Sequence, residues 1–188
     1  EAAIKLLREK GALKAESKIA NRIAADGIVD IYTEGTTTAM IEVNSETDFV
    51  SKNEEFVNFV DDLAKLALTA ETNDIEAFKA MAYEGSTVAD VLTAKIAKIG
   101  ENMSIRRIEK VSGDVVASYI HGGGRIGVIV VGKGEATDAV KEALTNIAMQ
   151  VAAMNPQYVS RDEISAEELA KIREITLESA LNDPVSLP

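Results

Sequence analysis

The stretch DGIVDIYTEGTTTAMIEV, residues 26–43, decides how the first half of the chain folds. Apolar and polar residues alternate with a period of two on both sides of Glu34-Gly35, a dipeptide typical of a turn. Both flanks are rich in residues that favour extended backbone. The sequence therefore predicts a β-hairpin, with one strand over residues 28–32 and the other over residues 39–43.

An amphipathic helix is expected after this hairpin, because apolar side chains recur at helical spacing on one face: Phe56, Phe59, Val60, Leu63 and Leu66. Two signals compete for its first residue. Ser51 and Glu54 have the spacing of a capping box, and Asn53 is a second possible N-cap. Sequence reasoning leaves both starts open.

The remaining pattern alternates between helix and strand. A second glycine-rich turn, His121-Gly122-Gly123-Gly124, stands between two strand-like segments. The predicted elements are helices over 74–82 and 86–99, a strand over 103–108, strands over 115–119 and 126–131, a long helix from Val140 to Met154, and a last helix from Leu169 towards Asn182.

The two hairpins resemble each other when one is laid on the other. Gly35 and Gly122 are 87 positions apart, and at that offset Ile28 meets Val115 while Val43 meets Val130. This predicts an α+β fold with two related subdomains, each a small antiparallel sheet (a hairpin) backed by helices. Chance similarity between two amphipathic hairpins is the alternative.

The expected domains follow from this repeat. Residues 1–24 would be the end of an N-terminal helix with its linker, and residues 25–111 the first core subdomain. Residues 112–160 would form the second core subdomain, which is incomplete, and residues 161–188 would begin a helical hairpin extension.

Composition excludes several classes of function. The net charge of −11 disfavours direct nucleic-acid binding, which needs basic patches. The chain has no Cys, so no thiol nucleophile or cysteine-ligated metal is possible, and no apolar run is long enough to span a bilayer. We expect a protein without a membrane partner.

The glycine run after His121 imitates three known motifs. Gly122 to Gly127 match a dinucleotide fingerprint, but a strand rather than a helix follows. Gly127 to Lys133 resemble a Walker A loop, but Gly134 stands where Ser or Thr would bind Mg²⁺. The oxyanion-hole loop of lipases requires a G-x-S-x-G elbow that this chain does not have. We therefore expect no cofactor, no catalytic residue and no metal ligand.

The connection Thr47-Asp48-Phe49-Val50 raises a question that periodicity leaves open. Asp48 could be an N-cap, and Phe49 precedes Phe56 by seven residues, which favours a position on the same buried face. Alternatively, the connection presents Phe49 outward as an anchor for a partner protein, because exposed aromatic side chains often dominate interfaces.

Four segments in this order resemble the translation elongation factor Ts family: ADGIVDIY, IEVNSETDFVSKNEEF, AKIGENMSIRRIE and Ala117-Ser118-Tyr119-Ile120-His121. The resemblance extends from about Glu1 to Asn182. That family promotes nucleotide exchange on the GTPase elongation factor Tu. The resemblance also implies that most of the family's N-terminal helical domain and its C-terminal part lie outside this chain.

The resemblance implies a partner and a set of contact residues. In the family, the Asp-Phe of the Thr-Asp-Phe-Val motif inserts beside the Mg²⁺-binding region of elongation factor Tu. The matching residues here are Thr47, Asp48, Phe49 and Val50, and two further contact positions match Ile99 and His121. The factor would make and break no covalent bond, so it would not be an enzyme in the chemical sense.

Two alternatives to nucleotide exchange stay open. One is a scaffold module that binds the GTPase without accelerating GDP release. The other is an acid/base hydrolase that uses carboxylates and His121. The resemblance favours a cytoplasmic protein of bacterial type, and the start at Glu1 leaves an organellar origin open.

Overall fold

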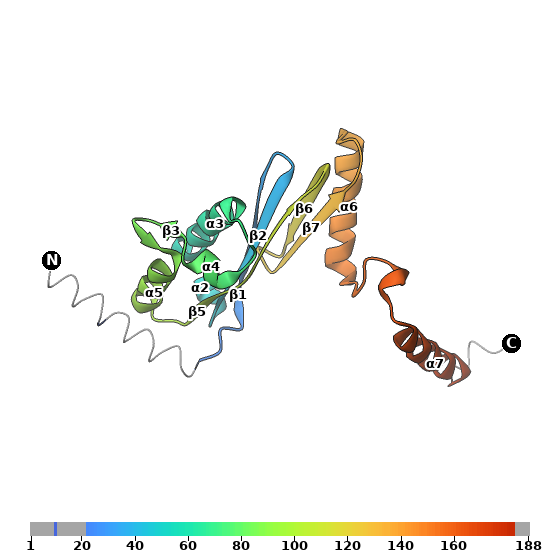
Figure 1. Cartoon of the computed structure of the whole chain (residues 1–188). Helices are drawn as coiled ribbons and strands as arrows, with labels where there is room; N and C mark the ends of the chain where they lie inside the picture. Colours follow the sequence, from blue (N-terminus) through green and yellow to red (C-terminus); the bar gives the residue numbers. More distant parts are fainter. Residues whose placement is uncertain (1–9, 11–21, 183–188) are drawn as a thin grey trace. The chain divides into compact units, whose positions relative to one another are not determined.

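The computed structural model describes residue 10 and residues 22–182, and these fall in two compact units that divide between Ala153 and Met154 (Figure 1). The expected helix end and linker at residues 1–24 lie largely outside the described residues. The expected domain boundaries near residues 24, 111 and 160 stay predictions.

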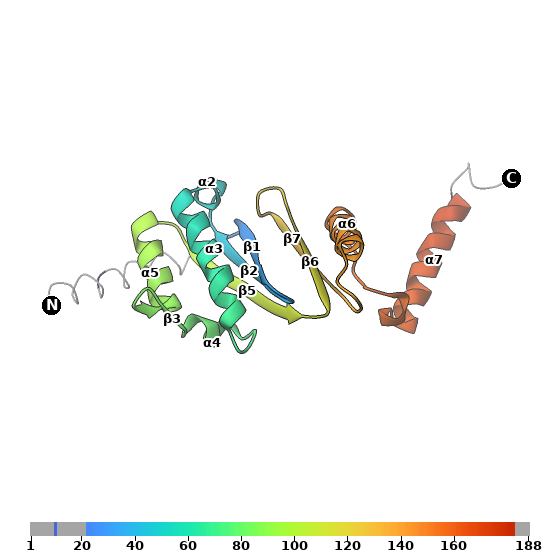
Figure 2. The ribbon, with the colours of Figure 1, turned by 90° about the horizontal axis from the view of Figure 1, so that it is seen from above.

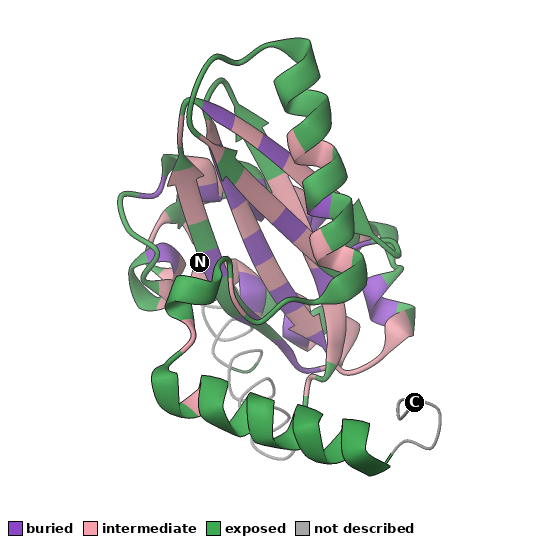
Figure 3. Ribbon diagram, turned by 90° about the vertical axis from the view of Figure 1, so that its right-hand side faces the viewer, coloured by how far each residue is buried: buried purple, intermediate pink, exposed green. Residues whose placement is uncertain are grey.

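The predicted hairpin forms two strands of a three-stranded antiparallel sheet. β1 (Asp26–Glu34) pairs with β2 (Thr37–Ser45), and β2 pairs on its other side with β5 (Met103–Ser112) (Figure 2). Buried and less buried residues alternate along β2, as Figure 3 shows for the sheet, because successive side chains of a strand point to opposite faces. The hairpin prediction is confirmed.

The core lies between this sheet and α3 (Glu54–Thr69), the predicted amphipathic helix. Ile41 and Val43 of β2 are buried against the inner face of that helix, which contributes Phe56, Phe59, Val60, Leu63, Ala64 and Ala67. The helical face predicted from the sequence is therefore the face that packs, apart from Leu66, which is only partly buried.

The segment between α3 and β5 differs from its prediction. The helix expected over 74–82 is α4 (Ile75–Lys79), and β3 (Ala82–Tyr83) then pairs with β4 (Ser86–Thr87). The tight turn at Glu84 and Gly85, both with positive φ, explains the change, because the chain must reverse there. α5 (Val88–Ile99) begins after the N-cap Thr87 and ends at Gly100 as predicted.

The second predicted hairpin is also confirmed. β6 (Val115–His121) pairs with β7 (Ile126–Gly132), and Gly122, Gly123 and Gly124 have φ of 62°, 67° and 93° in the turn. The main-chain N–H of Val29 in β1 donates to the carbonyl of Gly124 at 2.7 Å. The tip of the second hairpin therefore docks on the first sheet.

The two hairpins differ in register. β1 and β2 are joined by a two-residue turn that pairs Ile28 with Val43, whereas the four-residue turn of β6 and β7 pairs Val115 with Gly132. Applied to the observed pair Ile28 and Val43, the 87-position overlay would instead place Val115 opposite Val130. A shift of two residues keeps each side chain on its face but changes its partner. The α+β class is confirmed, and a common origin of the two hairpins stays a prediction.

The remaining helices lie towards the C-terminus. α6 (Asp138–Met154) ends where expected, before Pro156, and a Cβ added at Gly132 of β7 would lie 2.9 Å from Leu144 of this helix. The second unit contains a 3₁₀ turn (Arg161–Glu163) and α7 (Ala166–Asn182), whose first residues are capped by the side chains of Ser160 and Ser165, respectively. Among the residues described, we find no helix with the length and apolarity needed to cross a membrane.

Candidate functional site

The Thr47-Asp48-Phe49-Val50 motif forms a separate turn of helix. α2 (Asp48–Ser51) ends at Lys52, and α3 begins anew after Asn53, whose side-chain oxygen accepts from the N–H of Glu55 at 2.9 Å. Asn53 is thus the N-cap of α3, and the alternative start at Ser51 is wrong. Asp48 is the first residue of α2, so its interpretation as an N-cap is wrong too.

Phe49 is 84% exposed, whereas its neighbour Val50 is 7% exposed and belongs to the core. The break at Lys52 and Asn53 explains this difference from the sequence pattern. Seven-residue spacing places two side chains on one face only if a single helix connects them. Here two helices are involved, so Phe49 and Phe56 face different surroundings.

Asp48 carries a fixed negative charge beside Phe49. Its carboxylate accepts a hydrogen bond from the Nζ of Lys52 at 2.6 Å, one helical turn later. This bond and the charge of Lys52 hold the pKa of Asp48 below its ordinary value, with a smaller contribution from Arg125. The carboxylate is therefore ionised at neutral pH and paired with Lys52.

Two carboxylates fasten the motif to the segment that follows α5. Glu101 accepts from the N–H of Thr47 at 3.2 Å and from its Oγ1 at 2.7 Å. In return, Glu46 accepts from the N–H of Asn102 at 2.5 Å and from Arg22 at 3.2 Å. We call the Glu46 and Glu101 carboxylates, with the N–H groups of Asn102 and Thr47, the carboxylate clamp.

Ile99 lies next to this clamp. It is the last residue of α5, is partly buried, and packs against the core. Gly100 then takes a left-handed conformation with φ of 85°, which ends the helix and turns the chain towards Glu101. The structure thus connects the Ile99 segment directly to Thr47, through Glu101.

His121 lies on the second hairpin, at the end of β6. It is exposed, and its Nδ1 lies 2.9 Å from the hydroxyl of Tyr119. The turn that follows it docks on β1 at Val29, and α2 lies towards the same end of β1 (Figures 1 and 2). The hairpin turn that follows His121 thus lies near the same end of β1 as α2. The described hydrogen bond of His121 itself is with Tyr119, not with another predicted contact residue.

Sequence reasoning did not assign a role to Glu46, Glu101 or Asn102. The motif that includes Glu101 and Asn102 was part of the family resemblance, but the pairs of the clamp are separated by 54 and 56 positions. No local periodicity connects residues so far apart. Only the pairing of β2 with β5, which ends at Ser45 and Met103, brings the two segments together.

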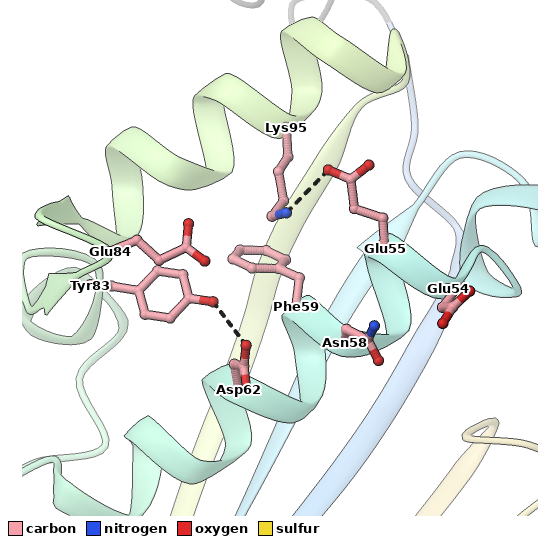
Figure 4. Close-up of a pocket in the computed structure, with 8 residues that line it drawn as sticks. All are labelled: Glu54, Glu55, Asn58, Phe59, Asp62, Tyr83, Glu84 and Lys95. Atoms are coloured by element: carbon pink, nitrogen blue, oxygen red, sulfur yellow. Dashed lines mark hydrogen bonds and ion pairs between the residues drawn. The ribbon is translucent and has the colours of Figure 1, made fainter.

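A pocket of about 350 Å³ lies elsewhere, between α3, α5 and the β3–β4 turn (Figure 4). The Nζ of Lys95 lies 5.0 Å from the centre of the Phe59 ring and 3.4 Å from Glu55. The Tyr83 hydroxyl lies 3.3 Å from Asp62, and burial together with that carboxylate raises the pKa of Tyr83. The first pair thus joins α5 to α3, and the second joins β3 to α3.

Metal binding and acid/base chemistry find little support. Within residues 22–182, no group of three or more His, Asp or Glu side chains could hold a metal ion. The recorded neighbour of His121 is a tyrosine hydroxyl rather than a carboxylate, so the arrangement is not that of a catalytic triad. The exposed motif on α2 is therefore the strongest candidate site, and its geometry suits contact with a protein.

Comparisons with known proteins show which family the chain resembles. A family model described as "Elongation factor TS" matches residues 46–185. Proteins named Elongation factor Ts from Deinococcus deserti and Clostridioides difficile are 46% and 50% identical, over 96% and 97% of this chain. A third, from Deinococcus radiodurans, is 43% identical over 95% of the chain.

The chain spans 62–67% of the length of these relatives. The residues matched by the family model include the α2 motif, the clamp and the second hairpin. The chain belongs to the elongation factor Ts family.

Proposed function

We propose that this chain binds elongation factor Tu and promotes release of its GDP by disturbing the Mg²⁺ site of the GTPase. The family supports a role as nucleotide exchange factor in translation elongation. The observation that carries the finer proposal is the exposure of Phe49 beside the ionised Asp48, on a turn that the clamp fastens to the core. Thr47, Asp48, Phe49, Ile99 and His121 would contact the partner, while Val50, the remaining residue of the motif, would hold the turn in the core.

The geometry of Phe49 suits insertion into a partner. Its ring protrudes from a short helical turn, while Val50 anchors the same turn in the core. Burial of an exposed phenylalanine in a pocket contributes about 1.5–3 kcal/mol. Because the turn is already folded, little of this free energy would be spent on ordering it.

The proposed mechanism is a coupling between two binding equilibria. If the factor binds nucleotide-free elongation factor Tu more tightly than the GDP form, linkage requires that it weaken GDP by the same factor. Mg²⁺ requires nearly ideal octahedral geometry, so a small displacement of its ligands costs much of its affinity. Insertion of Phe49 near that ion would therefore accelerate GDP release.

A GDP-release assay tests this proposal. Elongation factor Tu loaded with a fluorescent GDP analogue is mixed with the purified chain, and the release rate is followed at several chain concentrations. We expect Phe49→Ala to lower the stimulated rate by about tenfold or more, which corresponds to at least about 1.4 kcal/mol. Asp48→Ala should weaken the stimulation to a smaller extent.

A matched control is Leu177→Ala, which removes another exposed apolar side chain, in α7, and should leave the rate unchanged. Unchanged GDP release by a folded Phe49→Ala variant would refute the insertion. Binding of elongation factor Tu without any acceleration by the parent chain would identify a scaffold module instead.

A further inference from the structure

We propose that Glu101, together with Glu46, positions Phe49 for its partner without touching that partner itself. This inference rests on the proposed function, because it concerns how the exposed ring is presented. It starts from the place where the β2–β5 ladder stops. Ser45 and Met103 form the last pair of that ladder.

Beyond this pair the segments that continue from β2 and precede β5 separate, and main-chain N–H groups near the end of the ladder need other acceptors. The N–H groups of Thr47 and Asn102 each donate to a carboxylate on the opposite segment. Glu101 accepts from Thr47, and Glu46 accepts from Asn102. Each segment thus provides a carboxylate to a main-chain N–H of the other. These bonds, made by side chains, extend the connection between β2 and β5 beyond the end of the main-chain ladder.

The clamp acts on the start of α2. Thr47 gives both its N–H and its hydroxyl to Glu101, and the carbonyl of Thr47 accepts in turn from the Ser45 hydroxyl at 3.0 Å and from the Ser51 N–H at 3.3 Å. Since Phe49 lies two residues after Thr47, the orientation of Thr47 sets the direction in which the turn points. A one-turn helix has little stability of its own.

A second contribution comes from Arg22. It donates to Glu46 at 3.2 Å, and its carbonyl accepts from the side chain of Asn102 at 2.9 Å. Asn102 is buried, so its polar groups need these partners. Arg22 therefore supports both Glu46 and Asn102 of the clamp, while the side chain of Phe49 stays exposed.

The same clamp couples two predicted contact residues. Glu101 follows Ile99 by two residues, and the left-handed Gly100 between them fixes the direction of the chain. The clamp therefore links the α2 turn that carries Phe49 to the end of α5 that carries Ile99, although the two residues are far apart in the sequence. Charge-assisted hydrogen bonds of this kind are shorter and stronger than neutral ones.

The test uses Glu101→Gln in the whole chain. Glutamine has the same shape, but its amide nitrogen is a donor and can no longer accept from Thr47, so one of the two bonds is lost. Amide hydrogen exchange is measured in the free protein. We expect Thr47, Ser51 and Lys52 to exchange about tenfold faster, a change of about 1.4 kcal/mol in local opening, while Ile41 and Val43 in β2 exchange as before.

The second readout is a double-mutant cycle in the GDP-release assay. Glu101→Gln alone should lower the stimulated rate by about tenfold. In the Phe49→Ala background it should have no further effect, because a positioning residue acts only through the side chain that it positions. Glu76→Gln, which removes the same charge from α4, is the control and should leave both readouts unchanged.

The outcomes are distinguishable. Parent-like exchange at Thr47 and Ser51 in Glu101→Gln, or a full additional loss of rate in the Phe49→Ala background, would overturn the positioning role. No effect of Phe49→Ala on GDP release would overturn the proposed function, whereas the exchange measurement would still decide whether the clamp holds α2. If Glu101→Gln fails to fold, Glu46→Gln breaks the reciprocal bond and is measured in the same way.

Discussion

Phe49 and Phe56 illustrate how one residue type can serve two purposes seven positions apart. Phe56 is fully buried between α3 and the sheet, and Phe49 is largely exposed on α2. Helical periodicity alone assigns both to the same face. The break at Lys52 and Asn53, where α2 ends and α3 is capped anew, separates their roles.

Alanine substitutions should separate these roles in stability measurements. Phe49→Ala should change the free energy of unfolding by no more than about 0.5 kcal/mol, as is usual for exposed positions. Phe56→Ala should cost about 3–5 kcal/mol, because it removes a buried ring and leaves a cavity. Urea unfolding followed by circular dichroism measures both. A large loss of stability in Phe49→Ala would mean that the ring packs in the core.

At the scale of the elements, the second hairpin depends on close approach to the first. Gly124 is buried, has φ of 93°, and its carbonyl accepts from Val29 of β1. A Cβ at this position would lie 2.9 Å from the Cβ of Ile28 and 3.1 Å from the carbonyl oxygen of Val29. A side chain would therefore push the hairpin tip away from β1.

Gly123, one residue earlier, offers a matched comparison. It has φ of 67°, and a Cβ there would meet no atom within 4 Å. Gly123→Ala should therefore cost only the strain of the left-handed backbone, about 1–2 kcal/mol. Gly124→Ala should cost roughly 1–3 kcal/mol more, because it adds overpacking against β1. Equal unfolding free energies for the two variants, measured in urea, would contradict the docking of the tip.

The elements also show what the sequence can and cannot predict. Alternation around Glu34-Gly35 predicted the first hairpin, and apolar spacing predicted the inner face of α3, because both depend on neighbours along the chain. The β3–β4 pair was missed, since two-residue strands carry too short a pattern. The clamp was missed because Glu101 reaches Thr47 only after β5 has paired with β2, which local patterns do not encode.

At the scale of the whole molecule, stability should depend on pH through residues that join β2 to β5. Glu42 of β2 accepts from Arg106 at 2.8 Å and from Arg107 at 2.6 Å, both in β5. Burial alone would raise the pKa of Glu42, but these two hydrogen bonds and the charges of the arginines lower it below its ordinary 4.5. The ionised form is therefore favoured by folding.

The sign of the pH dependence follows. Because the folded pKa is lowered, Glu42 contributes its full stabilisation above 4.5 and loses it as the pH falls through the folded value. Glu42→Gln should cost about 1 kcal/mol or less at pH 7, in the range of exposed ion pairs, and nothing at pH values below the folded pKa. Urea titrations at a series of decreasing pH values, from neutral until the difference between variant and parent no longer changes, measure this effect.

Asp30 in β1 provides a comparison of opposite sign. Burial raises the pKa of Asp30 in the folded protein, so its ionisation opposes folding as the pH rises. The stability of Asp30→Asn relative to the parent should therefore increase with pH, whereas that of Glu42→Gln should decrease. If the relative stabilities of both variants changed with pH in the same direction, the local surroundings would not determine the pKa values of Asp30 and Glu42.

The bond from Val29 to Gly124 also has a consequence for synthesis. β1 is an outer strand of its sheet, and an outer strand offers unpaired main-chain groups to any other extended chain. The hairpin tip covers part of that side, but it is translated some 95 residues after Val29, and chains grow at about 5–20 residues per second. We therefore expect β1 to be open to strand addition by neighbouring nascent chains for several seconds, until the second hairpin folds.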